Sequence, residues 1–442
     1  MLDRPLDAVI VGAGHRALTY AAYAKSHPKQ LRIVGVADRI ERRRDLVRLE
    51  YDLPGERCFV TAQELAATER FADIAINGTM DHQHVPTSLP LLEAGYHLLL
   101  EKPFATSVEE MWQLVEAAQR KERHVSICHV LRYTPFYAAI RQQVADGVIG
   151  DLLNIQAVEH VSYHHMAVGF VRGKWSQQSY CQSTMLMSKS CHDLDLIAWM
   201  HSGVPAARVS SFGSNLQFRP ERAPKDAGTR CLVDCPIEAE CQYSARKHYI
   251  DHPQRWSFYV WDTLEHISDP SLEDKIASLK GDNPYGRCVW KCDNDVVDHQ
   301  SVAIEFADGV SATLNMIGGS AKPTRSLHLI GTLGEIQGVM EDSRFVIRHI
   351  DPRPGHEFSE EVVDLRQSGD MTGAFGGHGG GDMRLVEDFL KVVRGESPSL
   401  STTSIEDSVT GHLLGFSADR ARREASVVDL RHGDLLQPST YP

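Results

Sequence analysis

A glycine-rich turn near the start of the chain has the residue types that bind a dinucleotide. The apolar run 8–11 predicts a buried strand, and Gly-x-Gly-x-x-Ala follows it from Gly12 to Ala17. The first glycine permits a tight turn, the second leaves room for a pyrophosphate, and Ala17 lets a helix pack on the strand. The helix N-terminus then offers its free N–H groups to the phosphates. The predicted cofactor residues here are Gly12, Gly14, His15 and Arg16; the alternative is a structural glycine turn.

The next apolar run, 31–37, ends at an acidic residue, Asp38, followed by Arg39. A carboxylate at this place binds the ribose hydroxyls of the adenosine half of NAD and repels the extra phosphate of NADP. Arg39 beside it leaves some tolerance for NADP. We therefore predict NAD as the cofactor, with Asp38 and Arg39 in its site.

Three further strands are predicted over 73–77, 97–100 and 124–128, and polar residues follow their carboxyl ends. The carboxyl ends of parallel strands meet at one edge of a sheet, so these residues should face the cofactor. The candidates are Gly78, Thr79, His84, Glu101, Lys102 and Arg132. For Arg132 a structural role at the junction of two domains is an equal alternative.

A second group of chemical interest is Ser190-Cys191-His192-Asp193, before the apolar run 194–200. Ser190 and Asp193 resemble a capping box, which predicts a helix that starts here. In its first turn the helix dipole disfavours imidazolium, so His192 would be neutral and able to accept a proton. Asp195 would share its face and orient the ring. The alternative is a capping and packing histidine.

The elements around these residues predict two domains. Strands and helices alternate over residues 1–130, which indicates a doubly wound parallel α/β sheet, a Rossmann domain. Beyond about 150, short alternating strands predict an α+β domain with a largely antiparallel, open-faced sheet, and Asp308-Gly309 predicts a hairpin inside 301–316. Residues 131–442 would form this substrate-binding and oligomerisation domain, with an insertion at about 219–300.

The composition of the chain argues against some classes of binding partner. The net charge of -13 argues against nucleic acid and anionic membranes as partners. The chain reaches its first predicted strand by residue 8 and has no long apolar span, so we expect a cytoplasmic protein whose nine cysteines are mostly thiols. The cysteines at 231, 235, 241, 288 and 292 fit the spacing of a zinc site only in part, and no metal is predicted.

The glycine turn, Glu101-Lys102-Pro103 and Cys191-His192-Asp193-Leu194-Asp195 together resemble the Gfo/Idh/MocA oxidoreductase family. The resemblance covers almost the whole chain. It implies that Lys102 lies against the nicotinamide and the substrate, that the Lys–Pro bond is often cis, and that His192 is catalytic. Relatives often have an aspartate four residues before this histidine. Here that residue is Ser188, and Lys189 beside it is a candidate for part of the role.

The insertion and the glycine loop 376–382 look like a carbohydrate-acting branch of that family, which includes NAD-dependent glycoside hydrolases. We therefore expect hydride transfer at a sugar C3. The favoured outcome is a glycosidase that recycles NAD, possibly on an anionic glycoside such as a sulfoquinovoside. A sugar or polyol dehydrogenase is the first alternative, and a non-catalytic NAD-sensing protein is the second.

The expected roles follow from this interpretation. The catalytic candidates are Lys102, His192, Lys189 and Tyr163. Aromatic and basic groups suit a sugar ring with an anionic substituent, and the substrate candidates are His164, Arg172, Lys174, Trp175, Asp195 and His378. Because the second sheet has an open face, we also expect a homo-oligomer, either a dimer or a tetramer.

Overall fold

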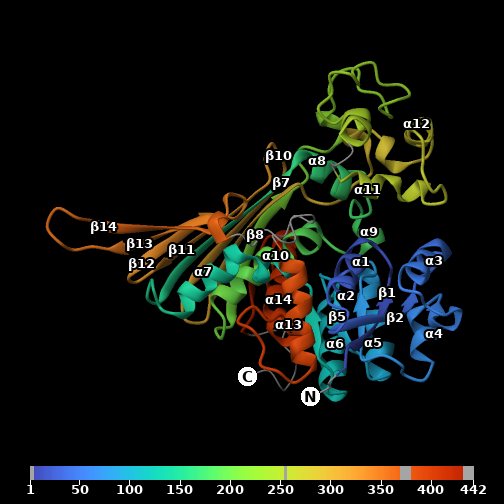
Figure 1. The fold of residues 1–442 in the computed structure, drawn as a ribbon. Helices are drawn as coiled ribbons and strands as arrows, with labels where there is room; N and C mark the ends of the chain where they lie inside the picture. Colours follow the sequence, from blue (N-terminus) through green and yellow to red (C-terminus); the bar gives the residue numbers. More distant parts are fainter. Residues whose placement is uncertain (1–3, 253–255, 369–379, 432–442) are drawn as a thin grey trace.

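The computed structural model describes residues 4–252, 256–368 and 380–431, which form two sheets and the helices that cover them (Figure 1). The first sheet has six parallel strands in the order β3-β2-β1-β4-β5-β6. Its strands are β1 Leu6–Val11, β2 Leu31–Ala37, β3 Cys58–Phe59, β4 Ile74–Asn77, β5 His97–Leu100 and β6 Val125–Ile127. Its helices are α1 His15–Ala21, α2 Tyr23–Ser26, α3 Glu41–Glu50, α4 Ala62–Ala66, α5 His84–Glu93 and α6 Val108–Arg120.

The central strands of this sheet are buried on both faces, as their continuous apolar sequences require. All four residues of β4 are buried, and so are Ala8, Val9 and Ile10 in β1. The strand order reverses between β1 and β4, which places a crevice at their carboxyl ends. The predicted doubly wound Rossmann sheet is confirmed.

The second sheet has nine strands in the order β14-β13-β12-β11-β7-β10-β9-β8-β15. All neighbouring strands in this sheet pair antiparallel except β7 with β10. The strands are β7 Leu152–Ser162, β8 Ala206–Ser214, β9 His299–Phe306, β10 Ser311–Ser320, β11 Thr324–Gly331, β12 Gly334–Val339, β13 Arg344–Ile350, β14 Phe358–Asp364 and β15 Val427–Asp429. The largely antiparallel second sheet is therefore confirmed.

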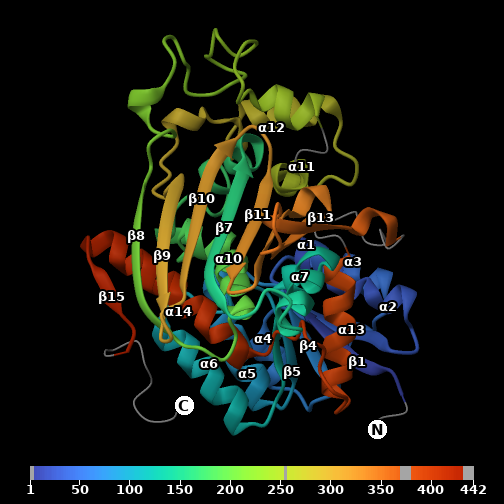
Figure 2. The same ribbon diagram turned by 90° about the vertical axis from the view of Figure 1, so that its left-hand side faces the viewer.

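Local sequence explains much of this sheet. The hairpin between β9 and β10 turns at Asp308-Gly309, where Gly309 has a φ of +93° that favours glycine. Along β9 and β10 buried residues alternate with more exposed ones, so one face packs on the core while the other is open. Figure 2 shows the open face toward the viewer, with α10 (Met185–Met200) and α14 (Ile405–Glu424) behind the sheet.

The remaining helices follow the first sheet in the chain, and two of them return to pack on it. Besides α10 and α14 they are α7 Pro135–Ala145, α8 Tyr163–Met166, α9 Gln178–Cys181, α11 Ser257–Val260, α12 Leu272–Lys280 and α13 Gly381–Val393. Although α13 and α14 come late in the chain, Phe389 and Leu390 of α13 share a core with β1, and Ile405 and Val409 of α14 share one with β5. The returning helices therefore fix the second domain to the first, and a division at residue 130 stays a prediction.

An insertion is expected at about 219–300, and the segment between β8 and β9 in this part of the chain has little regular structure. Its helix α12 begins after Ser271, whose side chain forms a capping box with Asp274. Residues Lys247–Asp251 of the same segment form a single π-type turn. Among the described residues, no helix is long and apolar enough to cross a membrane.

Candidate active site

A cavity of about 550 Å³ lies where the carboxyl edge of the first sheet meets the second domain and the insertion. Its wall on the Rossmann side includes Gly12, Gly14, His15, Arg16, Asp38, Arg39, Gly78, Thr79, His84, Glu101 and Lys102. The opposite wall includes His165, Lys174, Trp175, Lys189, His192, Trp256, Tyr259 and Arg325. The cavity is thus built from segments that lie far apart in the sequence.

The glycine turn at one end of the cavity leaves room for a phosphate group. Gly12 has a φ of +75°, and a Cβ there would lie 2.9 Å from Thr79. A Cβ on Gly78 would lie 2.8 Å from the Cβ of Ala17, so the small pair lets helix α1 approach β4. A Cβ on Gly14 would meet only the Gly78 carbonyl oxygen, at 3.9 Å, and would otherwise take up open space beside the cavity. This cradle fits the pyrophosphate of a dinucleotide.

Asp38 is fixed at the end of β2 by main-chain hydrogen bonds. Its Oδ2 accepts from the N–H of Ala13 at 2.7 Å, and its Oδ1 accepts from the N–H of Ile40 at 2.8 Å. A carboxylate oxygen can accept more than one hydrogen bond, so Asp38 keeps capacity for ribose hydroxyls. The site therefore fits NAD at both the phosphate and the ribose positions.

Arg16 and Glu101 pair with each other beneath the cofactor wall. Arg16 Nε lies 2.8 Å from Glu101 Oε1, and Arg16 Nη2 lies 2.5 Å from Asp382 Oδ1. The hydroxyl of Tyr20 also donates to Glu101, at 2.6 Å. Burial opposes the ionisation of Glu101, but the charges of Arg16 and Lys102 outweigh it and the pKa of the carboxyl is lowered. These groups form an ion-paired floor that holds the strand ends in place.

Lys102 follows β5 and reaches the second domain. The Lys102–Pro103 peptide bond is cis. Lys102 Nζ donates a hydrogen bond to the main-chain oxygen of Ser188, at 2.6 Å. Since Ser188 lies one turn before His192 on α10, this contact brings the ammonium group beside the helix face that carries the histidine.

The expected start of the helix that carries His192 is wrong. Helix α10 begins at Met185, five residues before Ser190, and the Thr184 side chain accepts from the N–H of Met187 as its N-cap. His192 therefore lies in the third turn, where the dipole argument for a neutral ring does not apply. Its ring lines the cavity and meets the buried ring of His129 edge-on, with centroids 5.5 Å apart.

Four charged side chains compensate one another behind this end of the cavity. Glu159 on β7 lies 3.1 Å from Lys189 Nζ and 2.5 Å from Arg325 Nε on β11, and the same Nε lies 3.2 Å from Asp193 Oδ1. Burial raises the pKa of Asp193 to about 7, against the opposing charge of Arg325. Burial also lowers the pKa of Lys189, and the charge of Arg325 lowers it further. Lys189 can therefore lose its proton more readily than an exposed lysine.

Aromatic rings from the insertion complete the wall. The Trp256 ring stacks on His165 with centroids 3.9 Å apart. Lys174 Nζ lies 4.9 Å from the ring centroid of Trp175 and 4.8 Å from that of Tyr259. Burial lowers the pKa of Lys174. This side of the cavity thus offers ring faces and a half-buried cation.

Two family models match the chain, and together they cover most of it. The oxidoreductase family model described as an NAD-binding Rossmann fold matches residues 6–129, and the Gfo/Idh/MocA C-terminal domain matches residues 137–337. The chain belongs to the Gfo/Idh/MocA oxidoreductase family. Its first domain is an NAD-binding Rossmann domain.

Relatives of this protein match it over different lengths of its chain. YteT of Bacillus subtilis, named only as a candidate oxidoreductase, is 24% identical over 328 residues, 72% of each chain. Glycosyl hydrolase family 109 protein 1 of Shewanella sp. (strain ANA-3) is 30% identical over 105 residues, 23% of each chain. Among solved structures, levoglucosan dehydrogenase in complex with NADH and levoglucosan has a TM-score of 0.68 at 17% identity, covering 97% of this chain and 100% of that chain.

In this Gfo/Idh/MocA protein, Arg132 and Asp195 bind each other. Arg132 is 2% exposed; its Nε and Nη2 donate to Asp195 at 2.7 and 2.6 Å, and its Nη1 donates to the Thr402 oxygen at 2.8 Å. Neither side chain lines the cavity. His129, whose ring meets that of His192, has its Nε2 3.8 Å from Asp195 Oδ1. This arrangement corresponds to the structural alternative for Arg132, and the orientation of the His192 ring by Asp195 stays a prediction.

Three more candidates lie outside the cavity. Arg172 is 1% exposed and donates to Tyr243, Tyr249 and Arg287 oxygens, so it anchors the insertion rather than a substrate. The rings of Tyr163 and His164 pack edge to face, and Tyr163 also packs on His248. Another substrate candidate from the sequence, His378, lies outside the described residues.

The sequence did not single out several residues of the cavity wall. Arg325 lies on an alternating strand and has no motif around it, and its partners Glu159 and Asp193 lie far away in sequence. Tyr259 and Trp256 lie in the irregular insertion. The excess of aromatic residues over 256–261 was the one available signal. Within the described ranges, no group of three or more His, Cys, Asp or Glu side chains is arranged to hold a metal ion.

Proposed function

We propose that this protein oxidises a hydroxyl group of a carbohydrate and that Lys102 and His192 carry the chemistry. The observation behind the proposal is the hydrogen bond from Lys102 Nζ to the Ser188 oxygen, one helical turn before His192. It brings an ammonium group and an imidazole to the same end of the NAD-binding cavity. A hydroxyl oxidation needs both kinds of group.

The roles follow from elementary chemistry. When bound, NAD supplies a nicotinamide ring that accepts a hydride from the carbon bearing the hydroxyl group. The Lys102 ammonium binds the hydroxyl oxygen and stabilises the negative charge that develops on it. His192 takes the hydroxyl proton as general base. The products are a ketone on the sugar and one proton on the imidazole.

The substrate wall favours a sugar with an anionic substituent. Trp175 and Tyr259 offer ring faces, and Lys174 offers a cation beside both. Burial of an ammonium group costs free energy, and an anionic ligand offsets that cost. Levoglucosan dehydrogenase, a sugar enzyme of similar fold, supports a carbohydrate as substrate. A sulfonate such as that of a sulfoquinovoside fits this chemistry.

Glycoside cleavage is the second candidate, and Lys189 is the observation that favours it. After oxidation at C3 the C2 proton becomes acidic; a second base removes it, the C1 substituent leaves, water adds, and the hydride returns to C3. Lys189 lines the cavity and has a lowered pKa, which suits an amine base. The short match to a family 109 glycosyl hydrolase also supports this candidate. Tyr163, the other expected base, lies outside the cavity.

One assay separates the two candidates. Purified protein is mixed with NAD and a panel of neutral and anionic aryl glycosides and free sugars, while aryl release and nicotinamide absorbance are followed together. Reduced nicotinamide in proportion to consumed sugar identifies a dehydrogenase. Aryl release with only catalytic NAD and no build-up of reduced cofactor identifies a glycosidase.

We also propose that the protein is a homo-oligomer whose subunits meet at the open face of the second sheet. Phe212 and Ile317 on this sheet are 77% and 43% exposed. A broad sheet face with exposed apolar side chains is a common subunit interface. Light scattering on the purified protein tests this, and Phe212→Glu should shift a dimer or tetramer toward monomer.

A further inference from the structure

The edge of the Rossmann domain that receives the adenosine is rich in arginine. Arg39, Arg42, Arg43 and Arg44 follow Asp38 within six positions. Arg39 and Arg43 line the NAD cavity together with Asp38. Such a group of cations would attract the additional phosphate on the adenosine ribose of NADP. Within the Rossmann domain, the Asp38 carboxylate opposes this attraction because it repels the phosphate charge.

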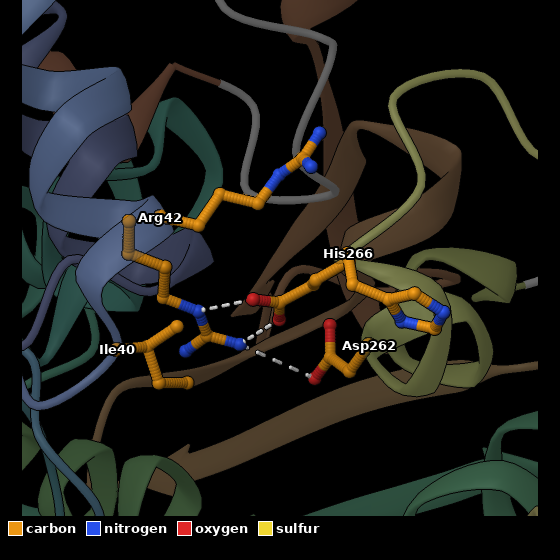
Figure 3. A pocket seen from close by; sticks show the side chains of 6 residues that line it. Ile40, Arg42, Asp262 and His266 are labelled. Carbon is orange, nitrogen blue, oxygen red and sulfur yellow. Dashed lines mark hydrogen bonds and ion pairs between the residues drawn. The ribbon is translucent and has the colours of Figure 1, made fainter.

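The insertion brings two further carboxylates to this edge (Figure 3). Arg43 Nε donates to Glu265 Oε2 at 3.0 Å, and Arg43 Nη2 donates to Glu265 Oε1. Asp262 Oδ2 lies 3.9 Å from the same Nη2. The side chains of Arg43 and Glu265 are each 26% exposed, so this bidentate pair is partly shielded from solvent.

The segment that carries these acids is fixed at a second place on the Rossmann domain. Phe258, seven residues before Glu265, stacks on His15 of the glycine turn with ring centroids 4.5 Å apart. Between these contacts Tyr259 lines the cavity. The segment 258–265 therefore crosses the cofactor wall from the phosphate end to the ribose end, and Glu265 is held beside Arg43.

We propose that Glu265 is a specificity-determining residue, which makes the enzyme prefer NAD over NADP by occupying the Arg43 guanidinium. Glu265 occupies the Nε–Nη2 edge of this guanidinium and neutralises its charge, so a ribose phosphate cannot bind that edge in bidentate fashion. The carboxylates of Glu265, Asp262 and Asp38 also repel the phosphate charge. Preference for NAD is then set jointly by Asp38 in the first domain and by an acid from the insertion.

The test measures cofactor binding directly, by isothermal titration of NAD, NADP, 5′-AMP and adenosine 2′,5′-bisphosphate. Glu265→Gln removes the negative charge that compensates Arg43, and we expect NADP and the bisphosphate to bind about tenfold tighter, while the Kd values of NAD and 5′-AMP change less than about twofold. The double variant Glu265→Gln/Arg43→Met should return NADP binding to the wild-type level, because the gain acts through Arg43.

The matched control is Glu41→Gln, which removes one exposed charge from the start of α3 without touching the pair. It should leave the ratio of the NADP and NAD Kd values unchanged. The proposal is overturned if Glu265→Gln keeps the wild-type ratio, or if Glu41→Gln raises NADP affinity as much. Should Glu265→Gln fold poorly, Asp262→Asn, whose carboxylate lies at 3.9 Å, gives the same readout with a smaller expected shift.

Discussion

The two walls of the cavity bind in different ways. The cofactor wall offers NAD mainly main-chain groups and the space that glycines leave free: the cradle at Gly12 and Gly14, and a carboxylate at Asp38 fixed by two N–H groups. The substrate wall consists of long side chains from several segments, and their charges are buried and mutually compensated, as at Glu159 and Arg325. The structure of a wall built from backbone depends on the φ angles of its residues and on the space around them. The structure of a wall built from ion pairs depends on the presence of every charged partner and on pH.

The largest effect is expected where the two walls meet, at Lys102 and His192. Lys102→Met and His192→Asn should each lower kcat by about 10²–10⁴-fold, because each removes a group that acts on the reacting hydroxyl. Steady-state kinetics on any sugar that the wild type oxidises measures the loss. The Kd of NAD should change little, which separates a chemical role from a role in cofactor binding.

Because the charges of the substrate wall are buried, removal of one member of an ion pair there should destabilise the fold. Arg325→Met leaves Glu159 and Asp193 without their shared cation, and we expect a loss of about 3–5 kcal/mol in the free energy of unfolding. Denaturant titration measures it. Arg348→Met breaks a half-exposed pair with Glu335 on the same sheet, and this control should cost about 1 kcal/mol or less. Equal losses in both variants would contradict the compensated cluster.

Substitutions at two glycines of the cofactor wall should have different effects, one on the stability of the fold and the other on NAD binding. Gly12→Ala places a Cβ 2.9 Å from Thr79 at a φ of +75°, so we expect a cost of about 1–3 kcal/mol in unfolding free energy. Gly14→Ala meets no close protein atom; it should leave the melting temperature unchanged and weaken NAD binding about tenfold. Thermal melts and titration calorimetry on both variants test the difference. Unchanged NAD binding in Gly14→Ala would exclude the cradle.

The pH dependence of stability should originate in the substrate wall. Asp193 has a pKa raised from 3.8 to about 7, so the folded state binds its proton more tightly than the unfolded state does. Its contribution is therefore complete below about pH 4 and is lost as pH rises toward 7. Asp193→Asn removes this loss, so unfolding free energies of wild type and variant, compared from pH 4 to 8, should show the wild type declining more. Parallel curves would mean that Asp193 does not titrate in this range.

The difference between backbone features and distant ion pairs also explains which parts of the structure the sequence could predict. The glycine turn, Asp38, the strands of the first sheet and the hairpin at Asp308-Gly309 depend on local backbone preferences, which a short stretch of sequence carries. The start of α10 was misplaced because Thr184 and Ser190 are both capable N-caps, and packing of the preceding turn decides between them.

Buried arginines cannot be recognised from local sequence patterns. Arg132 and Arg172 look like surface or ligand-binding cations in the sequence, yet each is almost fully buried on partners many residues away. Arg325 was missed for the same reason. A guanidinium satisfied by distant oxygens has no local signature, because its partners come together only when the chain folds.

The most direct test compares wild type with the double variant Lys102→Met/His192→Asn on one panel of neutral and anionic sugars and aryl glycosides. NAD is supplied, and nicotinamide absorbance and aryl release are recorded in the same sample. The account predicts that the wild type turns over at least one member of the panel, and that the double variant binds NAD but shows no turnover. Turnover by the double variant at the wild-type rate would contradict it. NAD binding by the wild type with no turnover of any member would also contradict it and favour an NAD-sensing protein.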